Sequence, residues 1–245
     1  QDFISIISTG TSQLTLNGVT KDSEGNVIPG ERLLVTFPNF ADGAPEEASE
    51  MTYKRTLQGN LPLPVRADIC YNYGTTAVTS YCLRRDPTST QPGVCNVNGQ
   101  KTVHNSAAPV QVVSMTENAA GKDKLIMTFK VAERGNGRLF QGDTGCAAAF
   151  ERKISEENRV KVKVDSGIAT LTSGDFTCRG IISPTSGLPV NVQEGDLRLT
   201  NGESIFTCTL NTANINADAL KEMTLTLTYD YLESKSTSIL VKHLI

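Results

Sequence analysis

Apolar and polar residues alternate with a period of two along most of this 245-residue chain. In MTLTLTYDY, residues 223–231, the methionine, leucines and tyrosines fall on one side, and the threonines and the aspartate fall on the other. RVKVKV, residues 159–164, alternates in the same way. Because successive side chains of a β-strand point to opposite faces, this period predicts strands with one face on a core and the other in water.

Further strands are expected where similar runs lie between turn residues such as Gly, Pro, Asn and Ser. They are residues 3–8, 12–18, 31–37, 50–57, 110–116, 123–131, 167–172, 175–182, 195–200 and 204–210. Helical periodicity is scarce, and residues 149–158 and 216–223 offer a short helical turn at most. The chain is therefore expected to belong to the all-β class.

Internal similarity indicates a tandem duplication. Three pairs of segments match in the same order in both halves of the chain: 3–8 with 109–114, 31–37 with 123–129, and 70–83 with 228–241. In the last pair, CYNYGTTAVTSYCL and TYDYLESKSTSILV, Tyr71 aligns with Tyr229 and Tyr73 with Tyr231. Each of these two blocks is expected to be part of a β-hairpin, with LESK as the loop of the second.

The polar stretch NGQKTVHNSAAP separates the two halves, as a domain boundary should. We predict an N-terminal β-sandwich over residues 1–104 and a larger C-terminal β-sandwich with inserted strands over residues 105–245. Many short strands with regular turn signals favour immunoglobulin-like sandwiches. The expected architecture is two such domains in tandem.

The chain has six cysteines: Cys70, Cys82, Cys95, Cys146, Cys178 and Cys208. No pair has C-x-x-C spacing and the chain has two histidines, so we do not expect a zinc site or another metal. An even number of cysteines in a β-rich chain favours three disulfides formed outside the reducing cytosol. The expected location is extracellular, at the cell surface.

The sequence leaves the disulfide pairing open. Cys178 with Cys208 is favoured because both lie in strand-like runs, DFTC and SIFTC, of the same region. Cys82 with Cys95 would close the RRDPTSTQPG loop, which leaves Cys70 for Cys146. The rival set, with Cys70–Cys82 and Cys95–Cys146, stands beside it.

Catalytic signatures are missing from the sequence. It contains no G-x-S-x-G, no phosphate-binding loop and no G-x-G-x-x-G. The acidic clusters around residues 46–50 and 156–157 resemble solvated surface more than a glycosidase pair. Asp22, Glu24 and Asn26 offer alternate oxygen donors for calcium but match no EF-hand, and an ordinary turn is the preferred interpretation. We expect no enzyme activity and no cofactor.

Charge and hydropathy restrict the classes of partner that the chain is expected to bind. The net charge of −3 and the scattered Lys and Arg residues do not favour nucleic acid. No run of 18 apolar residues predicts a membrane span. We interpret residue 1 as a processed or truncated start that a signal or anchor could have preceded.

The paired tyrosine motifs and the cysteine pattern resemble secreted archaeal β-sandwich proteins, in which a Cys-Tyr-x-Tyr hairpin ends one module and a Tyr-x-Tyr hairpin ends the next. They are also similar in plan to pilin-like filament subunits built from immunoglobulin-like domains. The resemblance covers the two hairpin blocks and the cysteines. It implies a structural or adhesive role.

The apolar terminal segments FISIIS and STSILVKHLI both point to self-association, and FISIIS is the favoured donor. Phe3, Ile4, Ile6 and Ile7 are candidate donor residues for strand addition to a neighbouring copy, although pairing within their own sandwich is an equal alternative. A head-to-tail contact of this kind produces fibres. We therefore expect a structural subunit of an extracellular, pilus-like filament or cell-surface assembly that polymerises with itself.

Two other functions remain as alternatives. A cell-surface adhesin or carbohydrate-binding module would need exposed loop aromatics, for which the candidates are Phe40 and Phe140. A secreted hydrolase is the third hypothesis, and the residues give it little support.

Overall fold

A computed structural model describes residues 20–21, 26–30, 58–91, 93–142 and 145–243. The chain divides into two compact units, one of residues 1–63 with 239–245 and the other of residues 64–238. In the first unit, β1 (Thr20–Lys21) pairs antiparallel with β2 (Val27–Ile28). The second unit carries the sandwich described below.

The sandwich is built from strands and one short helix. They are β3 (Leu61–Leu83), β4 (Gly99–Lys101), β5 (Val103–Asn105), β6 (Val110–Ala119), β7 (Lys124–Glu133), β8 (Arg138–Gln141), α1 (Ala147–Phe150), β9 (Arg159–Asp165), β10 (Phe176–Arg179), β11 (Val192–Arg198), β12 (Glu203–Asn211) and β13 (Ala219–Val241). None of the helices in the described part of the chain is long and apolar enough to cross a bilayer.

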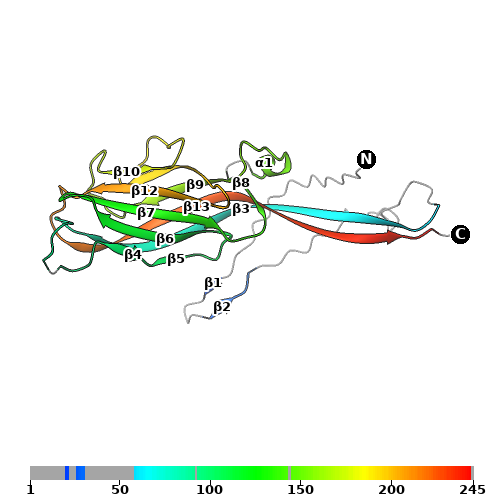
Figure 1. Ribbon diagram of the computed structural model, residues 1–245, viewed down its shortest axis with the longest axis horizontal. Helices are drawn as coiled ribbons and strands as arrows, with labels where there is room; N and C mark the ends of the chain where they lie inside the picture. Colours follow the sequence, from blue (N-terminus) through cyan, green and yellow to red (C-terminus); the bar gives the residue numbers. More distant parts are fainter. Residues whose placement is uncertain (1–19, 22–25, 31–57, 92, 143–144, 244–245) are drawn as a thin grey trace. The chain divides into compact units, whose positions relative to one another are not determined.

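The strands form two antiparallel sheets (Figure 1). One sheet has the order β10-β12-β7-β6-β4, and the other has the order β11-β9-β13-β3-β5 with β8 on β13. The predicted all-β class is confirmed, and the two sheets are arranged as a β-sandwich. β3, β4 and β5 come from the segment assigned by sequence to the N-terminal domain, and residues 104 and 105 lie within β5.

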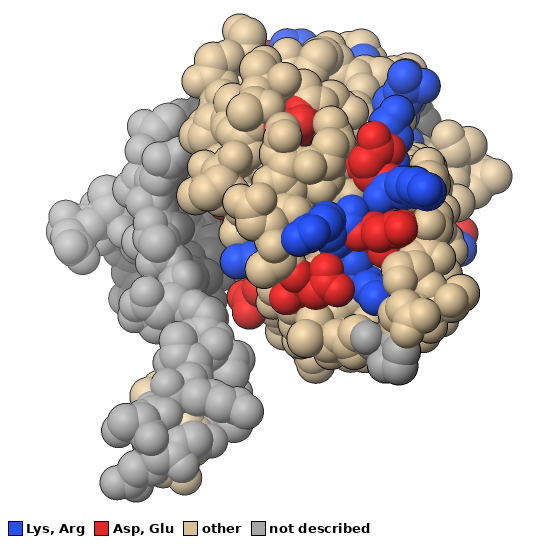
Figure 2. Space-filling model, turned by 90° about the vertical axis from the view of Figure 1, so that its left-hand side faces the viewer, with Lys and Arg blue, Asp and Glu red and all other residues tan. Residues whose placement is uncertain are grey.

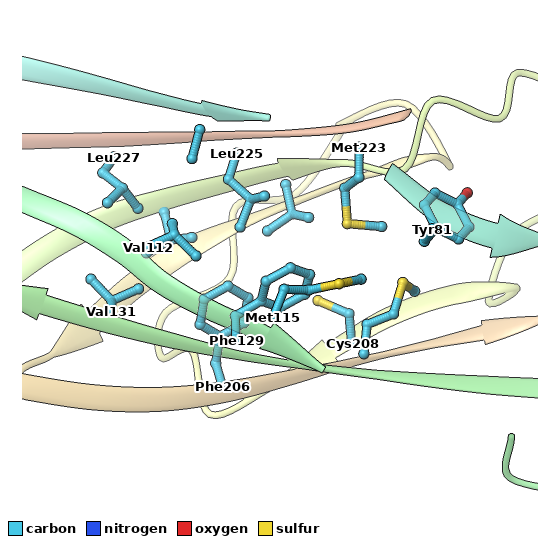
Figure 3. Close-up of a cluster of buried hydrophobic side chains, with 14 of the residues drawn as sticks. Tyr81, Val112, Met115, Phe129, Val131, Phe206, Cys208, Met223, Leu225 and Leu227 are labelled. Atoms are coloured by element: carbon cyan, nitrogen blue, oxygen red, sulfur yellow. The ribbon is translucent and has the colours of Figure 1, made fainter. Parts of the chain in front are cut away.

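The core lies between the two sheets and follows the period of two in the sequence. Every second residue of β7, of β9 and of residues 223–231 in β13 is buried, while the residues between them are mostly half-buried. Figure 3 shows Phe129, Phe206 and Cys208 from one sheet facing Met223 and Leu225 from the other. Side chains from the two inner faces interdigitate in this way wherever sheets pack face to face.

The expected tyrosine hairpins are wrong. Residues 61–83 form one uninterrupted strand, β3, and residues 219–241 form another, β13. LESK contains no Gly, Pro or Asn to support a tight turn, and the two long strands are neighbours in one sheet. The two blocks that match in sequence therefore lie on neighbouring strands.

Two smaller predictions also need correction. Residues 167–172 form a loop, although Ile168 and Leu171 pack in the core. The helical turn expected at 216–223 is absent, because β13 begins at Ala219. The strands expected at 3–8, 12–18, 31–37 and 50–57 lie outside the described residues.

The outer surface carries mixed charge. On the face shown in Figure 2, acidic and basic side chains are interspersed. Among the described residues, Lys130 and Glu203 form an ion pair at the surface, at 2.7 Å between Nζ and Oε2. Interspersed charge of this kind is typical of a solvated surface and differs from the basic field that binds phosphates.

Candidate functional site

β3 and β13 continue as a two-stranded ribbon, defined here as residues 64–72 of β3 and 230–238 of β13 (cyan and red in Figure 1). Asn72 Nδ2 donates to Asp230 Oδ1 (2.8 Å), and Ser234 Oγ donates to Asp68 Oδ1 (2.5 Å). Residue numbers rise along one strand as they fall along the other, so the strands are antiparallel. Side chains 64–69 and 233–238 are exposed on both faces of the ribbon.

Four tyrosines stand where the ribbon leaves the core. The ring centroids of Tyr73 and Tyr229 are 6.0 Å apart, and those of Tyr71 and Tyr231 are 5.9 Å apart. Tyr229 and Tyr231 are fully buried, whereas Tyr71 and Tyr73 are half-buried. The tyrosines that the sequence match singled out therefore form one cluster across two neighbouring strands.

The tyrosine hydroxyls connect the two sheets. The Tyr229 hydroxyl accepts from Val110 N (3.1 Å) and contacts Thr75 Oγ1 (3.1 Å). The Thr75 hydroxyl donates its proton to Val110 O (2.7 Å), so Tyr229 must be the donor to Thr75. The three residues therefore form a closed ring of hydrogen bonds. Burial raises the pKa of Tyr229 to about 12, so the hydroxyl keeps its proton.

A disulfide and a buried aspartate brace the base of the ribbon. Cys70 is bonded to Cys146, which directly precedes α1. Asp230, fully buried, accepts from Cys146 N (2.7 Å) and from Asn72. Asn72 also donates to Gly142 O (2.6 Å). These bonds fix the segment that carries α1 against both ribbon strands.

Ribbon side chains also bond to one another. Arg66 Nε lies 2.7 Å from Asp68 Oδ1, and Arg66 Nη2 donates to Ser234 Oγ (2.9 Å). The hydrogen bond from Ser234 lowers the pKa of Asp68. Tyr71 donates to Glu233 Oε1 (3.1 Å). Hydrogen bonds between polar side chains of the two strands therefore stabilise the ribbon.

The six cysteines form three disulfides: Cys70–Cys146, Cys82–Cys95 and Cys178–Cys208. This is the first of the two pairing sets considered from the sequence. Cys178 and Cys208 face each other on the neighbouring strands β10 and β12. Three disulfides indicate an oxidising compartment.

A hollow of about 640 Å³ lies under the loop that Cys82–Cys95 closes. Arg84 is its charged side chain, but the guanidinium already binds Asp218 Oδ2 (3.3 Å), Ser89 O (3.2 Å) and Gln91 O (3.1 Å). The arginine therefore serves to fold the loop, and it leaves little capacity for a ligand.

Glu117 ties the two sheets together near the same loop. Its carboxylate is fully buried and accepts from Cys82 N (2.9 and 3.2 Å) and from Lys101 Nζ (3.0 Å). Burial raises its pKa, because desolvation outweighs the bonds to Cys82 and Lys101, which act in the opposite direction.

This raised pKa predicts a pH dependence of stability. An acid with a higher pKa in the folded than in the unfolded chain stabilises the fold below the unfolded pKa and loses that contribution as pH rises through the folded pKa. We expect the free energy of unfolding of the wild type, relative to Glu117→Gln, to increase as pH falls from 7 toward 4.5. Urea unfolding across this range measures it, with the exposed Glu203→Gln as control. A difference that is flat or decreases toward low pH would contradict the assignment.

The other candidate residues from the sequence are placed as follows. Phe3, Ile4, Ile6 and Ile7 lie outside the described residues, as do Asp22, Glu24 and Phe40. Phe140 is fully buried in β8, so its expected exposure in a loop is wrong. The described residues hold no group of three or more His, Cys, Asp or Glu side chains arranged for a metal ion.

Sequence reasoning missed the ribbon itself. The sequence signal for it is the alternation of Val65, Ala67 and Ile69 just before the tyrosine motif, preceded by Pro62 and Pro64. No known family model matches the chain, and no curated protein is significantly similar to it. The geometry of the ribbon and its brace therefore carries the functional argument.

Proposed function

We propose that this protein is a structural subunit of an extracellular, pilus-like filament or cell-surface assembly, in which copies join head to tail by β-strand addition. The observation that carries the proposal is the ribbon of residues 64–72 and 230–238, which leaves the core and whose residues 64–69 and 233–238 are exposed on both faces. A two-stranded ribbon is marginally stable by itself in water. A partner that adds strands to it would bury its apolar residues and satisfy its backbone.

The brace supports this proposal. Cys70–Cys146 and the bonds of Asp230 hold the ribbon base in one conformation, and a preorganised partner loses less conformational entropy on binding. The three disulfides suit a subunit that functions outside the cell. A contact between two different surfaces of the same chain repeats without closing and gives a fibre.

The tandem immunoglobulin-like arrangement also stays a proposal. Its support is the order of the three matched segment pairs, of which the tyrosine pair lies among the described residues. The adhesin alternative has less support, because Phe150 is the one aromatic side chain classed as exposed among the described residues. Carbohydrate sites usually need a wider aromatic surface, and we therefore rank self-assembly first.

Assembly is tested on the purified, non-reduced chain. We expect the mass from light scattering to rise with protein concentration and negative-stain microscopy to show fibres, because a non-closing contact has no fixed end state. A constant monomer mass up to millimolar concentration, with no fibres on the grids, would overturn the proposed function.

A further inference from the structure

One edge of the ribbon lacks a neighbouring strand. On the side of β3 away from β13, β5 pairs with Ala77 to Thr79, and Ser106 N donates to Thr76 O (2.8 Å). No other strand among the described residues pairs with residues 66–72 on that side. Backbone donors and acceptors along an unpaired edge are a template for strand addition.

The side chains along this edge continue the core outward. Alternate positions of β3 share one face, so Val65, Ala67 and Ile69 follow the line of Tyr71 and Tyr73. The tyrosines are half-buried against Tyr229 and Tyr231, whereas Ile69 is 56% exposed and Val65 is 37% exposed. An apolar line that leaves the core uncovered marks a surface for another polypeptide.

The opposite edge of the ribbon has a different character. Residues 233–238 of β13 read ESKSTS, without one apolar side chain. Charged side chains, lysine above all, protect sheet edges from strand addition, and Glu233 and Lys235 lie on this edge. On β3, Pro64 lacks a backbone N–H and ends the usable edge, since proline in a sheet normally turns its nitrogen to the open side. The open edge is therefore confined to residues 66–72, with Ala67, Ile69 and Tyr71 on one face and Arg66 and Asp68 on the other.

We propose that residues 66–72 of β3 are the acceptor edge for residues 3–7 of a second copy of this chain. The inference rests on the proposed function and names the two surfaces that would meet. Residues 3–7, FISII, carry no charge and hold four apolar side chains, three of them β-branched isoleucines. A strand of this length fits the open stretch of seven residues. Its backbone would supply the hydrogen bonds and its apolar side chains would cover Ile69 and Tyr71.

A mixing experiment separates acceptor from donor. Ile69→Asp places a charge in the acceptor line, and Ile4→Asp with Ile7→Asp places one charge on each face of the donor. Each variant alone is expected to stay monomeric, because it lacks one of the two surfaces. An equimolar mixture is expected to form a dimer and nothing larger, since one intact donor meets one intact acceptor. Sedimentation velocity measures both results.

Ile205→Asp is the matched control. Ile205 on β12 is 58% exposed, close to the value for Ile69, but it lies on the other sheet. This variant should assemble as the wild type does. A labelled peptide of residues 1–9 should bind the donor-defective variant at least about tenfold more tightly than it binds the same variant with Ile69→Asp. Circular dichroism checks that each variant is folded.

The outcomes separate the inference from the proposed function. If the wild type assembles and Ile69→Asp assembles equally well, the acceptor assignment is wrong and the proposed function stands. If the wild type stays monomeric while the peptide binds the donor-defective variant, the segment occupies the edge of its own chain, which overturns both the second copy as partner and the filament. If the wild type stays monomeric and the peptide does not bind, both proposals fail.

Discussion

Tyr229→Ala is expected to lower the free energy of unfolding by about 4 kcal/mol, because it removes a fully buried aromatic ring from between the two sheets. Tyr229→Phe keeps the ring and removes the hydroxyl. That change should cost about 1–3 kcal/mol, since the buried Val110 N–H loses its acceptor and the ring of bonds with Thr75 opens. Denaturant unfolding of the two variants measures the ring and the hydroxyl separately.

Tyr71→Phe is the control for these variants. The Tyr71 hydroxyl donates to Glu233, which is exposed to solvent, so water can replace the lost partner. We expect a loss of about 0.5 kcal/mol or less. If Tyr71→Phe and Tyr229→Phe destabilised the protein equally, the hydroxyl network of Tyr229 would not be the link between the sheets.

Local periodicity was enough to predict most strands of the sandwich. The runs expected at 110–116, 123–131, 159–164 and 204–210 correspond to β6, β7, β9 and β12. The residues expected to face inward, such as Val160, Val162 and Val164, are buried. In a sheet with one face on the core, every second residue of a strand is apolar, so the buried face can be predicted without long-range information.

Strand pairing could not be predicted in the same way. The match between the two tyrosine blocks suggested two equivalent hairpins, yet the blocks are antiparallel neighbours. Antiparallel strands meet the core and the ribbon in opposite order along the chain, so residues 70–83 run into the core, whereas residues 228–241 run out along the ribbon. Periodicity states which face of a strand is buried, but it does not identify the neighbouring strand.

Two glycines give a second case of a non-local requirement. RGNGR, residues 134–138, connects β7 of one sheet to β8 of the other. A Cβ atom on Gly137 would lie 2.6 Å from Tyr231 Cε1, and one on Gly135 would clash with the Tyr231 hydroxyl. Gly137 N donates to that hydroxyl (2.7 Å). The glycines make room for a ring that is 94 residues from Gly137 along the chain, which no local pattern reveals.

The ribbon also shows that the local sequence pattern cannot predict which strand faces are covered. The alternation of Val65, Ala67 and Ile69 predicts a strand with an apolar face, and a strand is present. Whether that face is covered depends on how far the opposite sheet extends, and this is a property of the assembled sandwich. Ile69 and Tyr71 follow one another on the same face of one strand, yet the first is exposed and the second is half-buried.

Replacing both Cys70 and Cys146 with serine is expected to cost about 4 kcal/mol, the largest loss among the three disulfides. This disulfide spans 76 residues, compared with 30 for Cys178–Cys208 and 13 for Cys82–Cys95. A longer closed loop restricts the unfolded chain more, so the corresponding loss for Cys82 and Cys95 is about 3 kcal/mol. Denaturant unfolding of the three double-serine variants under non-reducing conditions gives the ranking.

The Cys70–Cys146 variant should also differ from the other two in which part of the structure opens locally. Cys70 lies at the base of the ribbon, and Cys146 N is bonded to Asp230 on the facing strand. Without the disulfide, backbone amides of residues 64–72 should exchange with solvent faster, while those of β7 and β12 change only with global stability. The Cys82–Cys95 variant should leave ribbon exchange unaffected, because that disulfide closes a loop at the other end of β3. Equal ribbon protection in both variants would mean that Cys70–Cys146 does not hold the ribbon, and the preorganisation that supports the proposed assembly would have to come from Asp230 and Asn72 alone.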